Sequence, residues 1–190
     1  AVGGQVDVTN NRLFMGRGAF GRLPADSGST SFSEVTYRFS TDYKLTDINM
    51  VFASYDKGYK SGGFDFNGGV LEGDEQVPYD PEFVKATEIG SKNRLFDNNM
   101  ILNITAFHYD YEDLQVFRLS GSGPLTDNAA QSTITGLEVE FKIQASDNLK
   151  FDGSFGYLDA TYDEYTIDIP PTDFSGNRLN YAPEYTGHLG

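Results

Sequence analysis

Hydrophobic and polar residues alternate with a period of two along several parts of the chain. Between positions 35 and 44 the odd-numbered residues are mostly apolar or aromatic, and the even-numbered ones are polar or charged. Residues 137–144 and 149–157 repeat this pattern. Because successive side chains of a β-strand point to opposite faces, each run predicts a strand with one apolar and one polar face.

Three further segments have strand-like composition but less regular alternation. They are Ile48–Gly58, Phe83–Phe96 and Met100–Phe117, in which aromatic residues such as Phe107 and Tyr109 occur close together. Aromatic residues favour strands, and the 21 glycines of the chain suit the connections between them. The sequence therefore predicts an all-β protein.

Short and long connections between these predicted strands alternate strictly. Thr46-Asp47, Asp97-Asn98-Asn99 and Ser146-Asp147-Asn148 are typical of tight hairpin turns. The remaining links, rich in Gly, Pro and Asp, cover residues 59–82, 118–131 and 163–184. A transmembrane barrel has short periplasmic turns, long extracellular loops and strands of about 9–11 residues. We therefore expect an antiparallel meander forming part of a large transmembrane β-barrel, present here as an incomplete, open sheet.

Charge distinguishes the two ends of the predicted sheet. The chain has 14 Lys and Arg against 28 Asp and Glu, a formal net charge of −14. Residues 59–82, 110–133 and 159–185 hold 16 acidic and 3 basic side chains, which accounts for −13 of that total. A soluble β-sandwich adhesin could also show the alternation, but it gives no reason for acidic residues to collect at alternate connections. A polyanion would be repelled, so we expect no nucleic-acid partner.

Residues 51–64, VFASYDKGYKSGGF, resemble the strand-and-loop signature of TonB-dependent receptors. Further segments continue the resemblance in the same order along the chain. They are Pro81-Glu82, Thr87 to Lys92, Asn103 to Gln115, Asn128-Ala129-Ala130, Gly136-Leu137-Glu138 and Ala182-Pro183-Glu184.

The resemblance implies a large barrel in the outer membrane of a Gram-negative bacterium, with a plug in its lumen. It implies uptake of a scarce ligand, most commonly a ferric siderophore, driven by the TonB complex acting through an N-terminal region missing here. We expect residues 1–190 to be a partial barrel domain without the plug and the C-terminal strands, and Ala1–Thr30 to belong to an earlier loop. Outer-membrane lipid should contact the convex side, through Val35, Tyr37, Phe39, Leu137, Val139, Phe141, Ile143, Leu149, Phe151 and Phe155.

No catalytic or metal-binding arrangement is visible in the sequence. His108 and His188 lack a partner at helical spacing, and there is no cysteine. Oxygen ligands between Asp65 and Glu75 could attract calcium, but they do not fit the twelve-residue loop spacing, so a solvated acidic loop is favoured. We expect neither enzyme activity nor a cofactor. A passive porin and an outer-membrane hydrolase remain as alternatives.

Candidate ligand contacts fall into two groups. Lys57, Tyr59, Lys60 and Phe64 lie where a strand should enter an outer loop, although a membrane-interface girdle is an equal interpretation. Strand parity predicts that the second group faces a polar lumen. Its cations are Lys92, Arg94 and Lys142, and its acids are Glu88, Glu138 and Glu140. The simplest role of these charged residues is to pair with each other or with the plug. The acidic rim would repel an anionic siderophore complex, so cobalamin, heme or an oligosaccharide is an alternative ligand.

Overall fold

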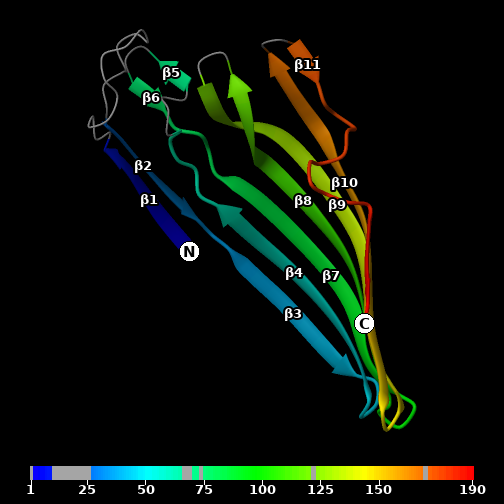
Figure 1. Cartoon of the computed structure of the whole chain (residues 1–190). Coiled ribbons are helices and arrows are strands. Elements are labelled where there is room, and N and C mark those ends of the chain that lie inside the picture. The colour runs from blue at the N-terminus through cyan, green and yellow to red at the C-terminus, as the bar shows by residue number, and fades with distance from the viewer. Residues whose placement is uncertain (1, 10–26, 66–69, 73–74, 121–122, 169–170) are drawn as a thin grey trace.

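The computed structural model describes residues 2–9, 27–65, 70–72, 75–120, 123–168 and 171–190. Most of them form one open antiparallel sheet (Figure 1), in which each strand pairs with the next strand of that sheet along the chain. This confirms the predicted meander. Both β11 and β12 pair with β10. The strands are β3 (Tyr37–Lys44), β4 (Asn49–Lys60), β7 (Glu82–Leu95), β8 (Met100–Ser120), β9 (Gly123–Ser146), β10 (Leu149–Asp168), β11 (Pro171–Asp173) and β12 (Tyr185–Leu189).

Two small hairpins accompany this sheet. β1 (Val2–Thr9) pairs with β2 (Ser27–Glu34), and β5 (Val70–Glu72) pairs with β6 (Glu75–Val77). The expectation that Ala1–Thr30 is a loop is wrong for residues 2–9 and 27–30, which pair as strands, whereas 10–26 lie outside the described residues. Within the described ranges, no helix is long and apolar enough to cross a membrane.

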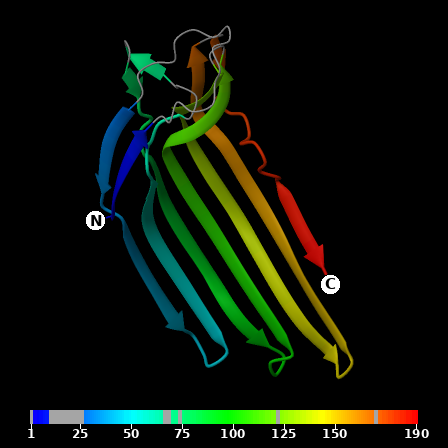
Figure 2. The same cartoon turned by 60° about the vertical axis from the view of Figure 1, so that its left-hand side comes forward.

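The three tight turns lie together at one end of the sheet (Figure 2), as predicted from their residues. In the first turn the Thr46 hydroxyl accepts hydrogen bonds from the amides of Ile48, at 3.2 Å, and Asn49, at 3.1 Å. In the second turn Phe96, Asp97 and Asn98 have φ values of 52°, 55° and 70°. Asp and Asn tolerate this left-handed conformation because their side chains can bond the local backbone.

Strand register gives the sheet an apolar face. Cross-strand partners point to the same side, and the register links Phe39 to Tyr55 and Val139 to both Ile104 and Phe155. Phe39 and Phe155 remain 66% and 45% exposed, so no second sheet covers this face. Val35 lies between β2 and β3, and Leu149 lies at a register shift. Eight of the ten predicted lipid-facing residues thus share one face: Tyr37, Phe39, Leu137, Val139, Phe141, Ile143, Phe151 and Phe155.

The prediction of a long loop at residues 118–131 is wrong. β8 and β9 continue as a paired hairpin as far as Ser120 and Gly123. The alternation is lost there because the register shifts between Tyr111 and Gln115, where Asp113 has a φ of 55°. A bulge places two residues opposite one and changes the parity of all that follow.

The only buried hydrophobic cluster among the described residues lies far from the short turns. Tyr162 and Tyr165 lie on either side of a second register shift, in β10, and both are buried with Ala130. The Phe174 ring stacks on Tyr165 at 5.2 Å between centroids, and Leu179 N donates to Ala160 O at 2.9 Å. The chain after β11 is therefore folded back onto the upper part of β10.

Candidate ligand-binding face

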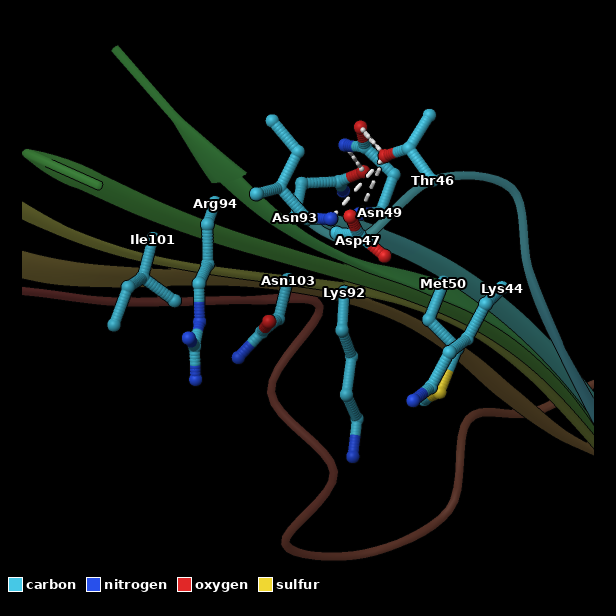
Figure 3. Close-up of a pocket in the computed structure, with 11 residues that line it drawn as sticks. Lys44, Thr46, Asp47, Asn49, Met50, Lys92, Asn93, Arg94, Ile101 and Asn103 are labelled. Carbon is cyan, nitrogen blue, oxygen red and sulfur yellow. Dashed lines mark hydrogen bonds between the residues drawn. The ribbon is translucent and has the colours of Figure 1, made fainter. Parts of the chain in front are cut away.

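Opposite the apolar face lies a polar face, and its end near the short turns is basic. Five cations lie there, and we call four of them, Lys44, Lys92, Arg94 and Lys142, the basic tier; the fifth is Lys150, which lines a hollow with Lys142. Register aligns Lys44, Met50, Lys92 and Asn103 in one row across β3, β4, β7 and β8. Figure 3 shows these side chains and Arg94 projecting from the same side of the sheet, into a hollow of about 390 Å³. The predicted residues Lys92, Arg94 and Lys142 therefore share this face, and Lys44 joins them.

Asp152 is the cross-strand partner of Lys142, but no side chain of the basic tier forms an ion pair in the described part of the chain. Among the described residues, no carboxylate lies within 4.0 Å of any of its four side chains. Lys92 Nζ instead lies 5.6 Å from the centre of the Phe52 ring, a cation–π distance. Cations outnumber the acids at this end of the polar face, where Asp152 lies opposite Lys142 and Glu140 lies in the row of Lys92, and the excess creates a positive potential that an anionic group can offset.

Three predicted carboxylates share this face with the basic tier. Glu88, Glu138 and Glu140, predicted to face the lumen, all lie on the polar face by register. Glu88 accepts a hydrogen bond of 2.6 Å from the Tyr109 hydroxyl, and Glu140 accepts one of 3.5 Å from Asn103. None of the three acids bonds to the basic tier, but Glu140 lies in the same cross-strand row as Lys44 and Lys92, so only Glu88 and Glu138 lie further from the short turns than these cations.

The four residues predicted at the start of the outer loop are divided between the faces. Lys57 and Tyr59 lie on the apolar face: Lys57 Nζ is 4.9 Å from the centre of the Phe83 ring, and Tyr59 stacks on the same ring at 6.3 Å. Lys60 lies on the polar face, 3.8 Å from Glu82. The half-buried Phe64 lies beyond β4. The positions of Lys57 and Tyr59 match the girdle interpretation more closely than a shared ligand site.

The outer loop between β4 and β7 is tied to the wall at its base. Gly63 and Tyr79 exchange backbone hydrogen bonds of 3.1 and 2.8 Å. A Cβ on Gly62 would lie 2.3 Å from the Tyr79 carbonyl oxygen, so glycine permits this close approach. Burial and the nearby Asp65 carboxylate raise the pKa of the Tyr79 hydroxyl above its ordinary value, which keeps it neutral.

Two amide side chains of the β8–β9 hairpin hold this loop. Gln115 Nε2 donates to the carbonyls of Ser61 and Asp80, both at 3.0 Å. Asn128 accepts from Asp80 N at 2.7 Å and donates to Asp80 O at 2.8 Å. We call Gln115 and Asn128 the amide clamp. The sequence marked both residues only as parts of motifs, because their partners lie 35 to 54 positions away.

We expect Gln115→Ala to loosen the outer loop without unfolding the wall. The variant loses two hydrogen bonds to backbone carbonyls, which should lower the free energy of local opening by about 1–2 kcal/mol. Hydrogen exchange of residues 61–65 and 77–80 in the full-length receptor would measure this as faster exchange. Gln144→Ala, in which the lost bond is a local one to Ser146, is the control. Equal exchange in both variants would contradict the clamp.

No metal-binding or catalytic cluster appears in the described part of the chain. There, no three His, Asp or Glu side chains come together as a metal site would require. His108 instead contacts Asp110 at 3.1 Å and Thr135 at 2.9 Å, and His188 lies 3.7 Å from Asp152. Of the acidic loop considered for calcium, residues 66–69 and 73–74 are outside the described residues.

Comparison with known proteins gives consistent matches. Residues 2–190 match the family described as TonB dependent receptor-like, beta-barrel. The chain is 27% identical over 172 residues to the metal-pseudopaline receptor CntO of Pseudomonas aeruginosa, a match that covers 89% of the chain and 22% of the receptor. It thus spans about a fifth of the length of this curated relative.

Two crystal structures share the fold. The ferric yersiniabactin uptake receptor FyuA from Yersinia pestis has a TM-score of 0.69 at 21% identity, covering 86% of this chain and 23% of FyuA. The ferric-catecholate import receptor Fiu from Escherichia coli K12, in its closed form, has a TM-score of 0.61 at 18% identity, covering 96% of this chain and 26% of Fiu. At these identities the two structures establish similarity of fold alone.

Proposed function

This chain belongs to the family of TonB-dependent receptor β-barrels, and from that premise we propose that the intact protein imports a metal chelate by TonB-dependent transport. Barrels of this family lie in the outer membrane of Gram-negative bacteria, which fixes the location of the sheet. The relatives are receptors and not enzymes. Residues 1–190 would then form part of the barrel wall, and the TonB complex would act through a plug outside this segment.

We base the proposed class of ligand, a metal chelate, on the basic tier. Metallophores and siderophores bind their metals through oxygen or nitrogen donors, many of them anionic, and such a chelate would be attracted to a surface where cations outnumber acids and form no ion pairs. The acidic loops above would repel a strongly anionic complex. A chelate with little net negative charge would pass the rim more easily, and it could still place individual carboxylates near Lys60 at the entrance and Lys92, Arg94 and Lys142 below.

Ferric siderophores are our first candidate, and chelates of other transition metals are the second. The second candidate follows from the relative named as a metal-pseudopaline receptor. Uptake of radioactive iron, nickel and zinc chelates in cells with and without TonB would test both. Uptake that requires both this receptor and TonB supports the proposal, and the metal identifies the class. Entry that persists without TonB would indicate a passive porin instead.

We expect the double variant Lys92→Glu/Lys142→Glu to weaken chelate binding by roughly 10- to 100-fold. Each substitution places a negative charge where we propose that the ligand meets a cation, and each should cost about 1 kcal/mol or more. Titration of the full-length receptor at low and high salt measures the change. Lys85→Glu, which makes the same change in charge on the opposite, apolar face, is the control. Unchanged affinity in the double variant would remove the basic tier from the binding site.

A further inference from the structure

Along β4, β7 and β8, the first Lys, Asp or Glu on the apolar face above the short turns lies in one cross-strand row. Along β7, the side chains on this face above Leu95 are uncharged until Lys85. The ten residue steps from Leu95 to Lys85 cover about 33 Å along the strand, or roughly 23 Å along the membrane normal at a tilt of 45°. The apolar band of an outer-membrane barrel is about 25 Å tall. Lys85 therefore lies where hydrocarbon gives way to lipid headgroups.

A cross-strand row runs through this level. Register places Tyr37, Lys57, Lys85 and Asp110 side by side on β3, β4, β7 and β8. Lys57 and Lys85 are direct partners, and like charges directly opposite each other destabilise a sheet unless an anion offsets them. The row thus combines two adjacent cations with an acid only on its far side.

The two lysines have different local partners. Lys85 Nζ pairs with Glu112 Oε1. Lys57 has no carboxylate within 4.0 Å among the described residues, and only the Phe83 ring orients it. An ammonium has three donor hydrogens, so both lysines can still donate to an added anion.

We propose that Lys57 and Lys85 bind a phosphate group of a lipid headgroup in the outer leaflet. Phosphate oxygens can accept charge-assisted hydrogen bonds from both ammonium groups at once. Tyr37 and Tyr55, 37% and 40% exposed and 5.9 Å apart between ring centres, stand beside the lysines, and such amphipathic rings favour the membrane interface. This surface lies outside the barrel, and so the inference does not depend on the proposed transport function.

The charges of neighbouring strands also determine which strands of the barrel the headgroup contacts. Asp110 and Glu112 on β8 repel a phosphate, whereas Lys57 and Lys85 on β4 and β7 attract it. The two lysines lie on an open surface that does not surround a ligand with hydrogen-bond donors. A free phosphate ion should therefore bind there only weakly. A lipid adds the burial of its acyl chains against the apolar residues below, such as Phe39 and Ile89, which are 66% and 58% exposed.

The test is lipid binding to the purified full-length receptor. Native mass spectrometry in detergent would follow titration with lipid A carrying two phosphates, with lipid A stripped of phosphate, and with inorganic phosphate alone. We expect Lys57→Gln/Lys85→Gln to weaken binding of the phosphorylated lipid about 30-fold, since each lysine near a membrane surface contributes about a factor of five. Lys150→Gln is the charge-matched control at the opposite end of the sheet.

Each outcome decides the proposal. Selective loss of phosphorylated lipid in the double variant, with dephosphorylated lipid and the control variant unaffected, supports it. Equal affinity of the double variant and the unmodified receptor overturns it, as does an equal loss in Lys150→Gln. Binding of inorganic phosphate as tight as that of the lipid would also overturn it, because the site would then recognise an ion and not a headgroup.

Discussion

Val139→Arg is expected to destabilise the membrane-embedded receptor by about 2–4 kcal/mol. Val139 lies between Ile104 and Phe155 on the apolar face, several residues above the short turns. An arginine there would put its charge near the centre of the hydrocarbon, where the cost in outer-membrane barrels has this size. Urea unfolding of the full-length receptor in lipid bilayers would measure the loss of free energy of unfolding.

Glu140→Arg is the matched control for this prediction. Glu140 is adjacent in sequence but points to the polar face, where a charged side chain can keep its hydration. We expect it to change the free energy of unfolding by less than about 1 kcal/mol. Equal destabilisation by the two arginines would mean that Val139 does not face lipid, and the assignment of the two faces would be wrong.

Gly136→Val is expected to cost about 3 kcal/mol for a different reason, the lack of space for a side chain. A Cβ at Gly136 would lie 2.3 Å from Phe107 Cζ and 2.7 Å from the carbonyl oxygen of Tyr157. The ring could rotate away, but the carbonyl belongs to the paired strand β10 and cannot move without disturbing the ladder. Thermal unfolding of the full-length receptor in detergent would measure the loss.

A second glycine provides the comparison for this steric prediction. At Gly187 the nearest atom to an added Cβ is the Ser154 carbonyl oxygen at 3.6 Å, an ordinary contact. Gly187→Val should therefore be nearly neutral. Adding Phe107→Ala to Gly136→Val should recover part of the stability, because the ring clash disappears while the backbone clash remains. No recovery would assign the whole cost to the carbonyl, and a neutral Gly136→Val would contradict the steric argument.

The wall of the sheet could be predicted because lipid imposes strict alternation on it. The run from Leu137 to Gln144 shows this, and the tight turns were visible in their Asp and Asn residues. The family resemblance of residues 51–64 is confirmed by the match over residues 2–190. At 118–131 the backbone remains paired, but the register shifts below it interrupt the alternation, and so the pattern there carries no period.

The sequence could not show which face each candidate lysine lies on, nor which residues from distant parts of the chain meet, because both depend on strand pairing. Lys57 and Lys60 are close in the chain, but aromatic residues on both parities hid which lysine shares a face with Phe39. The ladder between β3 and β4 settles this point. The amide clamp was missed for a similar reason, since no local pattern of Gln115 or Asn128 indicates contact with Asp80.

The two register shifts define a mechanical boundary. The shift in β8 begins just after Tyr111 and that in β10 just after Tyr162, and both residues are aligned with Ser132 on β9. Below this row the ladders are continuous down to the residues beside the turns; above it, each bulge interrupts the hydrogen bonds. A force on the tip of the β8–β9 hairpin should therefore bend the hairpin at this row. The part of the sheet between this row and the short turns should keep its shape.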